Sequence, residues 1–247
     1  MPVKSNFLKP HLAEIKFYNM DTQKLFIILF FLAVAGIVLG NYFFNKKARV
    51  RRKLKKATGK RITDFVSGEI AKVVGKIEYA GKSLVAPLSG RPCAYYYVLV
   101  EQKVSSNKSA YWETLIEEEV AGPFVIRDGK YCAHINSQNI KSYLVEDREY
   151  SSGFMEDATG TLEKYLEDHG QKSENFLGLN KRIRYKEGIL EEGELIAVVG
   201  RGEWKKAEQE QLPDSYGRVL SISSTDKEAV YLSDDPDTVK TQYAGAN

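Results

Sequence analysis

The stretch GEIAKVVGKIEY, residues 68–79, decides the fold, because the chain carries it a second time as GELIAVVGRGEW, residues 193–204. Six of the twelve aligned positions are identical, and the two copies lie 125 residues apart. In the first copy the odd-numbered positions from 71 to 79 are apolar or small, whereas Lys72, Lys76 and Glu78 fall on even-numbered positions. A period of two with one apolar side predicts a β-strand that buries one face.

The second copy has the same phase, so both strands are expected to turn the same side inward, with Val73 and Val198 buried. Gly75 and Gly200 mark a bend, a bulge or a close backbone approach. Strongly curved strands of this kind suit a small closed or partly closed barrel. The alternative is a single open sheet in which two strands converged on one pattern. The predicted fold class is mainly β (α+β), with a β-rich, barrel-like, pseudo-duplicated domain and one or two short helices.

Further strand patterns lie between the two copies. AYYYVLVEQKV, residues 94–104, and YWETLIEEEV, residues 111–120, are rich in aromatic and β-branched side chains and predict a hairpin. In FVIRDGKYCAHI, residues 124–135, Asp128-Gly129 separates two apolar runs and predicts a hairpin with a type I′ turn. Helical spacing appears in TGTLEKYLEDHG, residues 159–170, which predicts a short amphipathic helix.

An uncharged run precedes this domain. LFIILFFLAVAGIVLGNYFF, residues 25–44, holds twenty residues without a charge, and at about 1.5 Å per residue it matches a hydrocarbon core of roughly 30 Å. It predicts a single N-terminal transmembrane helix, with residues 1–24 as a short extracytoplasmic N-terminus. A cleaved signal peptide is the competing interpretation, but the run is long and no small-x-small site follows it, which favours a retained anchor.

A basic segment, residues 45–64, comes next. Residues 46–61 carry ten positive charges and no negative charge, so the positive-inside rule predicts that the C-terminal domain is cytoplasmic. The expected location is the inner (plasma) membrane. The segment is a topology determinant, and it is also expected to hold the chain against anionic lipid headgroups. The predicted membrane-surface residues are Lys46, Lys47, Arg49, Arg51, Arg52, Lys53, Lys55 and Lys56.

The remainder of the chain is acidic. The net charge of +3 combines +2 before the apolar run and +10 directly after it, which leaves −9 for residues 62–247. An acidic domain is a poor nucleic-acid binder, so no nucleic-acid partner is expected. Two cysteines and three scattered histidines form no zinc-ligand pattern, and neither a metal nor a cofactor is expected. Residues 236–247 are predicted to be a disordered tail.

Three stretches in order carry a family resemblance: LVAPLSGRPCAYYYVLVEQKV (84–104), WETLIEEEVAGPFVIRDGKYCAHI (112–135) and YKEGILEEGELIAVVGRGEW (185–204). Together they resemble the GIDE domain, or BAM ("beside a membrane") domain, of the mitochondrial ubiquitin ligase activator family, over residues 65–235. The chain has neither the second span nor the RING of the eukaryotic members, and is similar to RING-less prokaryotic versions. The resemblance implies a membrane-flanked, non-catalytic module that binds or presents a protein or small-ligand partner.

The S-G-R-P turn supplies the candidate binding residues, with its arginine offered to an acidic group; the alternative is a tight turn without a ligand. These candidates are Ser89, Gly90, Arg91 and Cys93. No catalytic residue is expected. Two enzymatic alternatives stay open: a ubiquitin-ligase-family enzyme by domain name, and a cysteine-dependent hydrolase using Cys93, or Cys132 with His134 on the same strand face. Small buried cysteines on strands are common, which disfavours the hydrolase.

Overall fold

The structure is a computed structural model that describes residues 26–34, 45–106, 109–145, 148–151, 160–172 and 182–240. The chain divides into two compact units, Met1–Phe44 and Asn45–Asn247. In the first unit residues 26–34 form a helix with exposed side chains. No helix within the described ranges has both the length and the apolar character needed to cross a membrane. Residues 1–25 and 35–44 lie outside those ranges, so the transmembrane helix stays a prediction.

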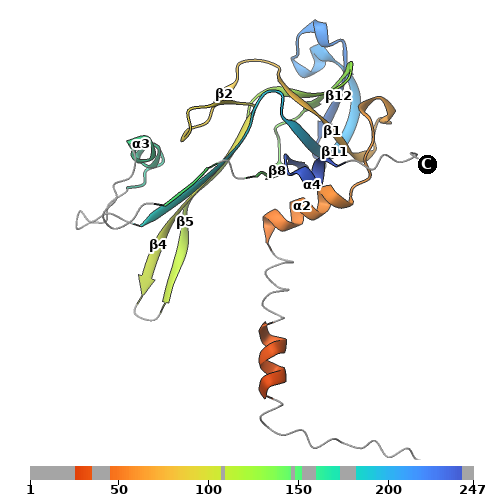
Figure 1. Ribbon diagram of the computed structural model, residues 1–247. Helices are drawn as coiled ribbons and strands as arrows, with labels where there is room; N and C mark the ends of the chain where they lie inside the picture. Colours follow the sequence, from red (N-terminus) through yellow and green to blue (C-terminus); the bar gives the residue numbers. More distant parts are fainter. Residues whose placement is uncertain are drawn as a thin grey trace, which may run out of the picture. The chain divides into compact units, whose positions relative to one another are not determined.

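A closed five-stranded barrel forms the centre of the second unit (Figure 1). Its strands, in spatial order, are β1 (Ile70–Tyr79), β6 (Phe124–Asp128), β7 (Tyr131–Ile135), β12 (Arg218–Ser223) and β11 (Leu195–Lys206). Pairing of β1 with β11 closes the ring, and only β7 and β12 run parallel within it. The predictions of a mainly β fold and of a closed barrel are therefore confirmed, and the open-sheet alternative is wrong.

The two copies of the repeated stretch are the pair of strands that closes the barrel. β1 and β11 run antiparallel, with Val73 opposite Val198 at the middle of the register. Both valines are fully buried in the main core, as the phase of the pattern predicts. The prediction did not include the direct pairing of the two copies. Because the pair is antiparallel and centred on equivalent residues, a local pseudo-two-fold axis relates the copies.

The turn before each strand repeats as well. Gly68 and Gly193 have positive φ angles of 93° and 85°, which glycine adopts without a Cβ clash. Glu69 accepts a hydrogen bond from the backbone N–H three residues earlier at 2.7 Å, and Glu194 does the same at 3.0 Å. The first glutamate of each copy is thus a turn cap, which explains its presence in both.

Gly75 and Gly200, the glycines at the predicted bends, lie where another strand comes close. A Cβ on Gly75 would lie 2.8 Å from the backbone oxygen of Arg127, and one on Gly200 would lie 2.5 Å from Cγ2 of Ile222. Such distances are too short for a real Cβ contact, so a close approach requires glycine at both positions.

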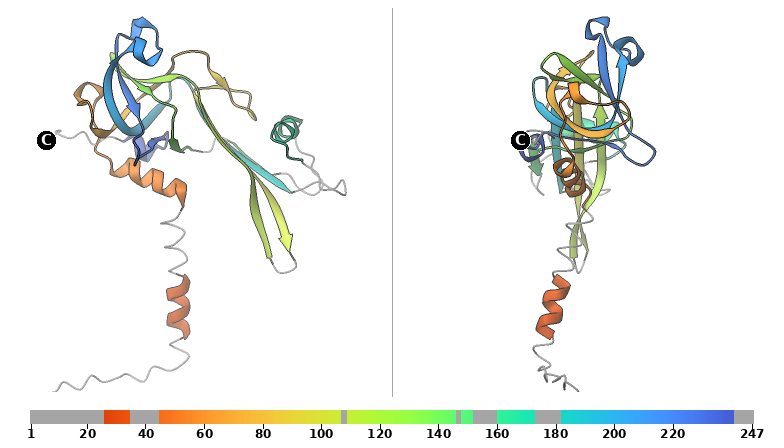
Figure 2. Two further views of the ribbon diagram at one scale, coloured as in Figure 1. Left: turned by 180° about the vertical axis from the view of Figure 1, so that it is seen from behind. Right: turned by 90° about the vertical axis from the view of Figure 1, so that its right-hand side faces the viewer.

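Two strands and a second sheet complete the β-structure. β13 (Val230–Ser233) pairs with β11, and β8 (Ile140–Tyr143) pairs in parallel with β13. The second sheet has the order β5-β4-β10-β9 and extends away from the barrel (Figures 1 and 2). Its strands are β4 (Tyr95–Ser106), β5 (Ser109–Ala121), β9 (Arg148–Ser151) and β10 (Ile183–Leu190). The predicted β4–β5 hairpin is confirmed, and the predicted amphipathic helix is α3 (Gly160–Asp168), whose apolar face packs on this sheet.

Short elements fill the connections. They are η1 (Ile62–Asp64), β2 (Leu84–Val85), β3 (Pro92–Cys93), η2 (Ala207–Glu210), η3 (Asp214–Tyr216) and α4 (Pro236–Val239). The β6–β7 hairpin exists as predicted, but its turn differs. Asp128 pairs with Tyr131, so the central residues are Gly129 and Lys130, and only Gly129 has a positive φ. This is the pattern of a type II′ turn rather than the type I′ turn expected.

The basic segment is part of the folded domain. It forms α2 (Lys46–Lys56), in which Val50 and Leu54 are buried against Ala197 and Val199 of β11. The compact unit begins at Asn45 and therefore includes the basic segment, ahead of residue 65 where the expected β-rich domain starts. Val50 and Leu54 stand four residues apart and so lie on one helix face. Two apolar residues among so many charged ones are too few to reveal an amphipathic helix in the sequence.

The predicted disordered tail also begins too early. Residues 236–239 form α4, and the Thr238 side chain is fully buried, with its hydroxyl donating to the Asp235 carbonyl at 2.8 Å. Residues 241–247 lie outside the described residues.

Candidate functional site

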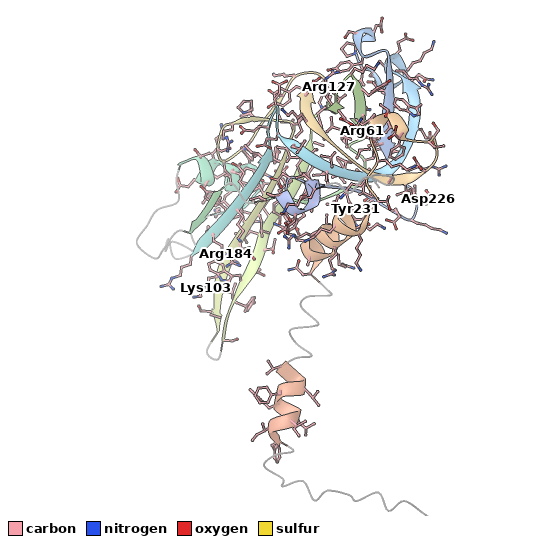
Figure 3. All side chains as sticks on the ribbon, turned by 45° about the vertical axis from the view of Figure 1, so that its right-hand side comes forward. Arg61, Lys103, Arg127, Arg184, Asp226 and Tyr231 are labelled. Atoms are coloured by element: carbon pink, nitrogen blue, oxygen red, sulfur yellow. The ribbon has the colours of Figure 1, made fainter. Side chains whose placement is uncertain are left out.

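A cavity of about 660 Å³ lies between α2 and strands β4, β5, β8 and β13. We call it the α2 cavity. Its lining is Lys46, Lys47, Arg49, Val50, Lys53, Tyr97, Glu117, Glu119, Ile140, Lys141, Ser142 and Tyr231. Five of these residues are basic, two are acidic, and the others give apolar, aromatic and hydroxyl surface. Tyr231, which Figure 3 labels, lies beside α2.

Glu119 is held at the cavity by two buried hydroxyl groups. The Tyr95 hydroxyl donates to Oε2 at 2.5 Å, and the Ser142 hydroxyl donates to Oε1 at 3.3 Å. The β4–β5 register places Glu119 opposite Tyr97, whose ring also lines the cavity. Glu119 lines the cavity and is partly exposed, but the protein around its carboxylate removes part of its hydration, and this desolvation raises its pKa.

Most of the positive charges at the cavity have a negative neighbour. Lys46 Nζ lies 3.9 Å from a Glu117 oxygen, and Lys53 Nζ lies 2.6 Å from a Glu228 oxygen. Lys47 Nζ stands 4.1 Å from the centroid of the Tyr97 ring, and its charge acts on Glu119.

Two cations in the lining are not matched in this way. Within the part of the chain that the structure describes, neither Arg49 nor Lys141 forms an ion pair or a side-chain hydrogen bond. Both side chains are exposed. The cavity therefore carries an excess of positive charge contributed by these two residues.

The eight predicted membrane-surface residues separate into three groups. Lys46, Lys47, Arg49 and Lys53 line the α2 cavity. Arg51 and Lys55 bind acidic residues at the end of the domain: Arg51 Nε lies 2.5 Å from Asp235, and Lys55 Nζ lies 3.1 Å from Asp237. Arg52 and Lys56 are not among the residues that line the cavity.

Sequence reasoning missed the contributions of other elements to this cavity. Lys141 and Ser142 come from a four-residue strand nearly a hundred residues after α2, and Glu119 stood in a run of three glutamates that reads as a solvated strand end. Only the tertiary fold brings these residues to α2.

The S-G-R-P turn lies elsewhere, and none of its candidate residues lines the α2 cavity. Gly90 has a φ of 71° and donates its N–H to the Ala86 carbonyl at 2.9 Å, which closes the turn. Arg91 makes a two-point ion pair with Glu191, with one N–O distance of 3.0 Å. The buried Glu187 carboxylate accepts from the Leu88 N–H at 2.9 Å. These contacts fit a braced structural turn, in which the arginine already has an acidic partner within the chain.

Both cysteines are buried. Burial raises the pKa of Cys93 to about 11 and also raises the pKa of Cys132. His134 shares the outer face of β7 with Cys132, but its Nδ1 lies 2.9 Å from a Glu210 oxygen. Lys205 Nζ donates to the same carboxylate at 2.6 Å. Although burial alone would raise the pKa of Glu210, the hydrogen bonds from Lys205 and His134 lower it overall.

The described residues contain no group of three or more His, Cys, Asp or Glu side chains that could hold a metal ion. Comparisons of the chain with protein-family models, with curated proteins and with solved structures give no match. The resemblance to the GIDE domain therefore stays a prediction from the quoted motifs.

Proposed function

We propose that this chain is a membrane-anchored, non-catalytic binding module of the GIDE/BAM type. Residues 25–44 anchor it in the inner (plasma) membrane, and the β-rich domain faces the cytoplasm and receives a protein or small-ligand partner at the bilayer. The observation that carries this proposal is the position of the α2 cavity in the chain. Its first lining residue, Lys46, stands two residues after the end of the uncharged run.

Chain geometry makes that short spacing informative. A fully extended chain spans at most about 3.5 Å per residue, so Lys46 and Lys47 lie within about 10 Å of Phe44 whatever the orientation of the two units. If residues 25–44 span the bilayer, the rim of the cavity is held at the depth of the lipid headgroups. A partner that is itself at the membrane then meets the cavity at high effective concentration.

The enzymatic alternatives receive less support. A nucleophilic cysteine needs an accessible thiol with a lowered pKa, whereas Cys93 and Cys132 are buried and their pKa values are raised. A ubiquitin-ligase activity would rest on the domain resemblance alone.

Topology mapping tests the proposal. Ser109, exposed at the start of β5, is replaced by Cys in the full chain, and a membrane-impermeant maleimide is applied to intact and to permeabilised cells. The expected result is a protein in the membrane fraction that is labelled only after permeabilisation. The unsubstituted chain is the control, because its two thiols are buried and should stay unlabelled. Recovery in the soluble fraction would contradict the anchor, and labelling of intact cells would contradict the cytoplasmic location.

A further inference from the structure

The unmatched charges of the α2 cavity define what it can bind. Lys46 and Lys53 each form an ion pair and the charge of Lys47 acts on Glu119, whereas Arg49 and Lys141 form no ion pair among the described residues. They come from different elements, α2 and β8, and line the same cavity, so an anion bound there is attracted by both. The volume of about 660 Å³ lies within the range of about 300–1,000 Å³ that is usual for small-ligand sites.

The chemistry of these two side chains favours a phosphate ester. A guanidinium offers a planar fork of N–H donors that matches phosphate oxygens, and a lysine ammonium adds a compact charge. Val50, Ile140 and the rings of Tyr97 and Tyr231 line the same space and provide an apolar wall. This wall suits a ligand that carries an organic part next to its anionic group.

We propose that the α2 cavity binds the phosphate ester of an anionic membrane lipid, with Arg49 and Lys141 as its phosphate ligands. The inference rests on the proposed function, since anchoring by residues 25–44 is what would bring lipid headgroups to the cavity rim. It adds a defined pocket and two ligands, one of which lies outside the basic segment. A soluble phosphate ester has the same anionic chemistry, and the experiment separates the two sources.

The test uses the full chain in phosphatidylcholine nanodiscs that contain a small fraction of phosphatidylglycerol with a photoreactive group near its glycerol. Cross-linked peptides are mapped by mass spectrometry. Labelling is expected to concentrate on residues 46–50 and 140–142. The Arg49→Gln, Lys141→Gln variant is expected to reduce this labelling at least about tenfold, because the loss of even one hydrogen bond to a charged group costs roughly a factor of ten.

The matched control is Lys56→Gln with Lys82→Gln, which removes the same charge from two exposed positions outside the cavity. It should change the labelling less than about twofold, because diffuse attraction of exposed charges is weak and screened. Thermal unfolding of both variants checks that the fold is kept.

Several outcomes would overturn the inference. Labelling unaffected by the cavity variant, or reduced equally by the control variant, would mean general electrostatic attraction instead of a site. Loss of labelling with glycerol 3-phosphate or inorganic phosphate at about 1 mM, but not with excess unlabelled phosphatidylglycerol, would assign the cavity to a soluble phosphate. In each case the topology experiment still reports on the anchor, so failure of this inference is distinguishable from failure of the proposed function.

Discussion

At the scale of the residue, Lys72 shows where sequence reading reached its limit. The alternation of β1 placed it on the polar face, yet its side chain is only 3% exposed. Its Nζ donates to the carbonyls of Thr238 at 3.2 Å and Lys240 at 3.3 Å. Burial lowers its pKa. The pattern of a strand reports which face is apolar, but it cannot report a segment that arrives 166 residues later and covers the other face.

Lys72 should make stability depend on alkaline pH. Because its pKa is lowered from 10.5 in the folded chain, the unfolded chain binds more protons between the lowered pKa and 10.5. In this window the contribution of Lys72 to the free energy of unfolding rises with pH. We expect the stability of the wild type, minus that of Lys72→Met, to increase as pH rises toward 10.5 in denaturant titrations. Buried tyrosines and cysteines titrate in both proteins, so their contributions cancel in the difference. If the free energies of unfolding of the two proteins ran parallel with pH, the prediction would be contradicted.

At the scale of the element, β1 and β11 were the best predicted part of the fold. Their alternation, the burial of Val73 and Val198, and the need for glycine at positions 75 and 200 all follow from the sequence. The strands with which β1 and β11 pair did not follow from the sequence. The first glutamate of each copy proved to be a local cap, whereas the second pair diverged: Glu78 binds Arg127, and Glu203 stays at the surface, 3.7 Å from Arg201. A short-range pattern specifies a strand and its face, but pairing depends on long-range closure.

The kink glycines give a test of this packing. Gly75→Ala forces a Cβ against the backbone of β6, which cannot move without disturbing the sheet, so we expect a loss of about 2–3 kcal/mol in the free energy of unfolding. Gly200→Ala meets the Ile222 side chain, which has more freedom, and should lose about 1–2 kcal/mol. Chemical denaturation measures both. Gly160→Ala is the control, because its Cβ would meet no atom within 4 Å. If the Gly75→Ala and Gly200→Ala variants were as stable as this control, the close approach of the strands would be refuted.

α2 gives a second prediction at this scale. Leu54 is fully buried between the helix and β11, so Leu54→Ala should reduce the free energy of unfolding by about 2–4 kcal/mol. The exposed neighbour Lys56 is the control, and Lys56→Ala should change it by less than about 0.5 kcal/mol. If α2 were only a linker along the membrane, both substitutions would be silent in an equilibrium denaturation experiment.

At the scale of the whole molecule, part of the basic segment forms ion pairs with acidic residues of the same domain. The basic segment and the acidic domain looked like separate surfaces, but part of each faces the other. Arg51 binds Asp235, Lys53 binds Glu228 and Lys55 binds Asp237. These pairs are partly exposed, so each contributes little by itself. They nevertheless reduce the positive charge available to a membrane, whereas Arg49 and Lys141 at the α2 cavity form no ion pair among the described residues. Composition predicted both charge totals but not which charges meet.

The structure therefore predicts where the folded domain begins. A fragment of residues 65–247, which matches the boundary read from sequence, lacks the buried side chains Val50, Leu54 and Ile62. Each fully buried aliphatic side chain contributes about 1.5–3 kcal/mol, so this fragment should be several kcal/mol less stable than residues 45–247. A fragment of residues 57–247 keeps Ile62 and should fall between the two. Thermal and chemical unfolding of the three fragments measures the order, and equal stabilities would show that α2 is dispensable to the fold. Measurements at high salt separate the contribution of apolar burial from that of the ion pairs. At about 1 M salt the Debye length is about 3 Å and exposed ion pairs are screened, so the stability differences between the fragments should persist if burial dominates.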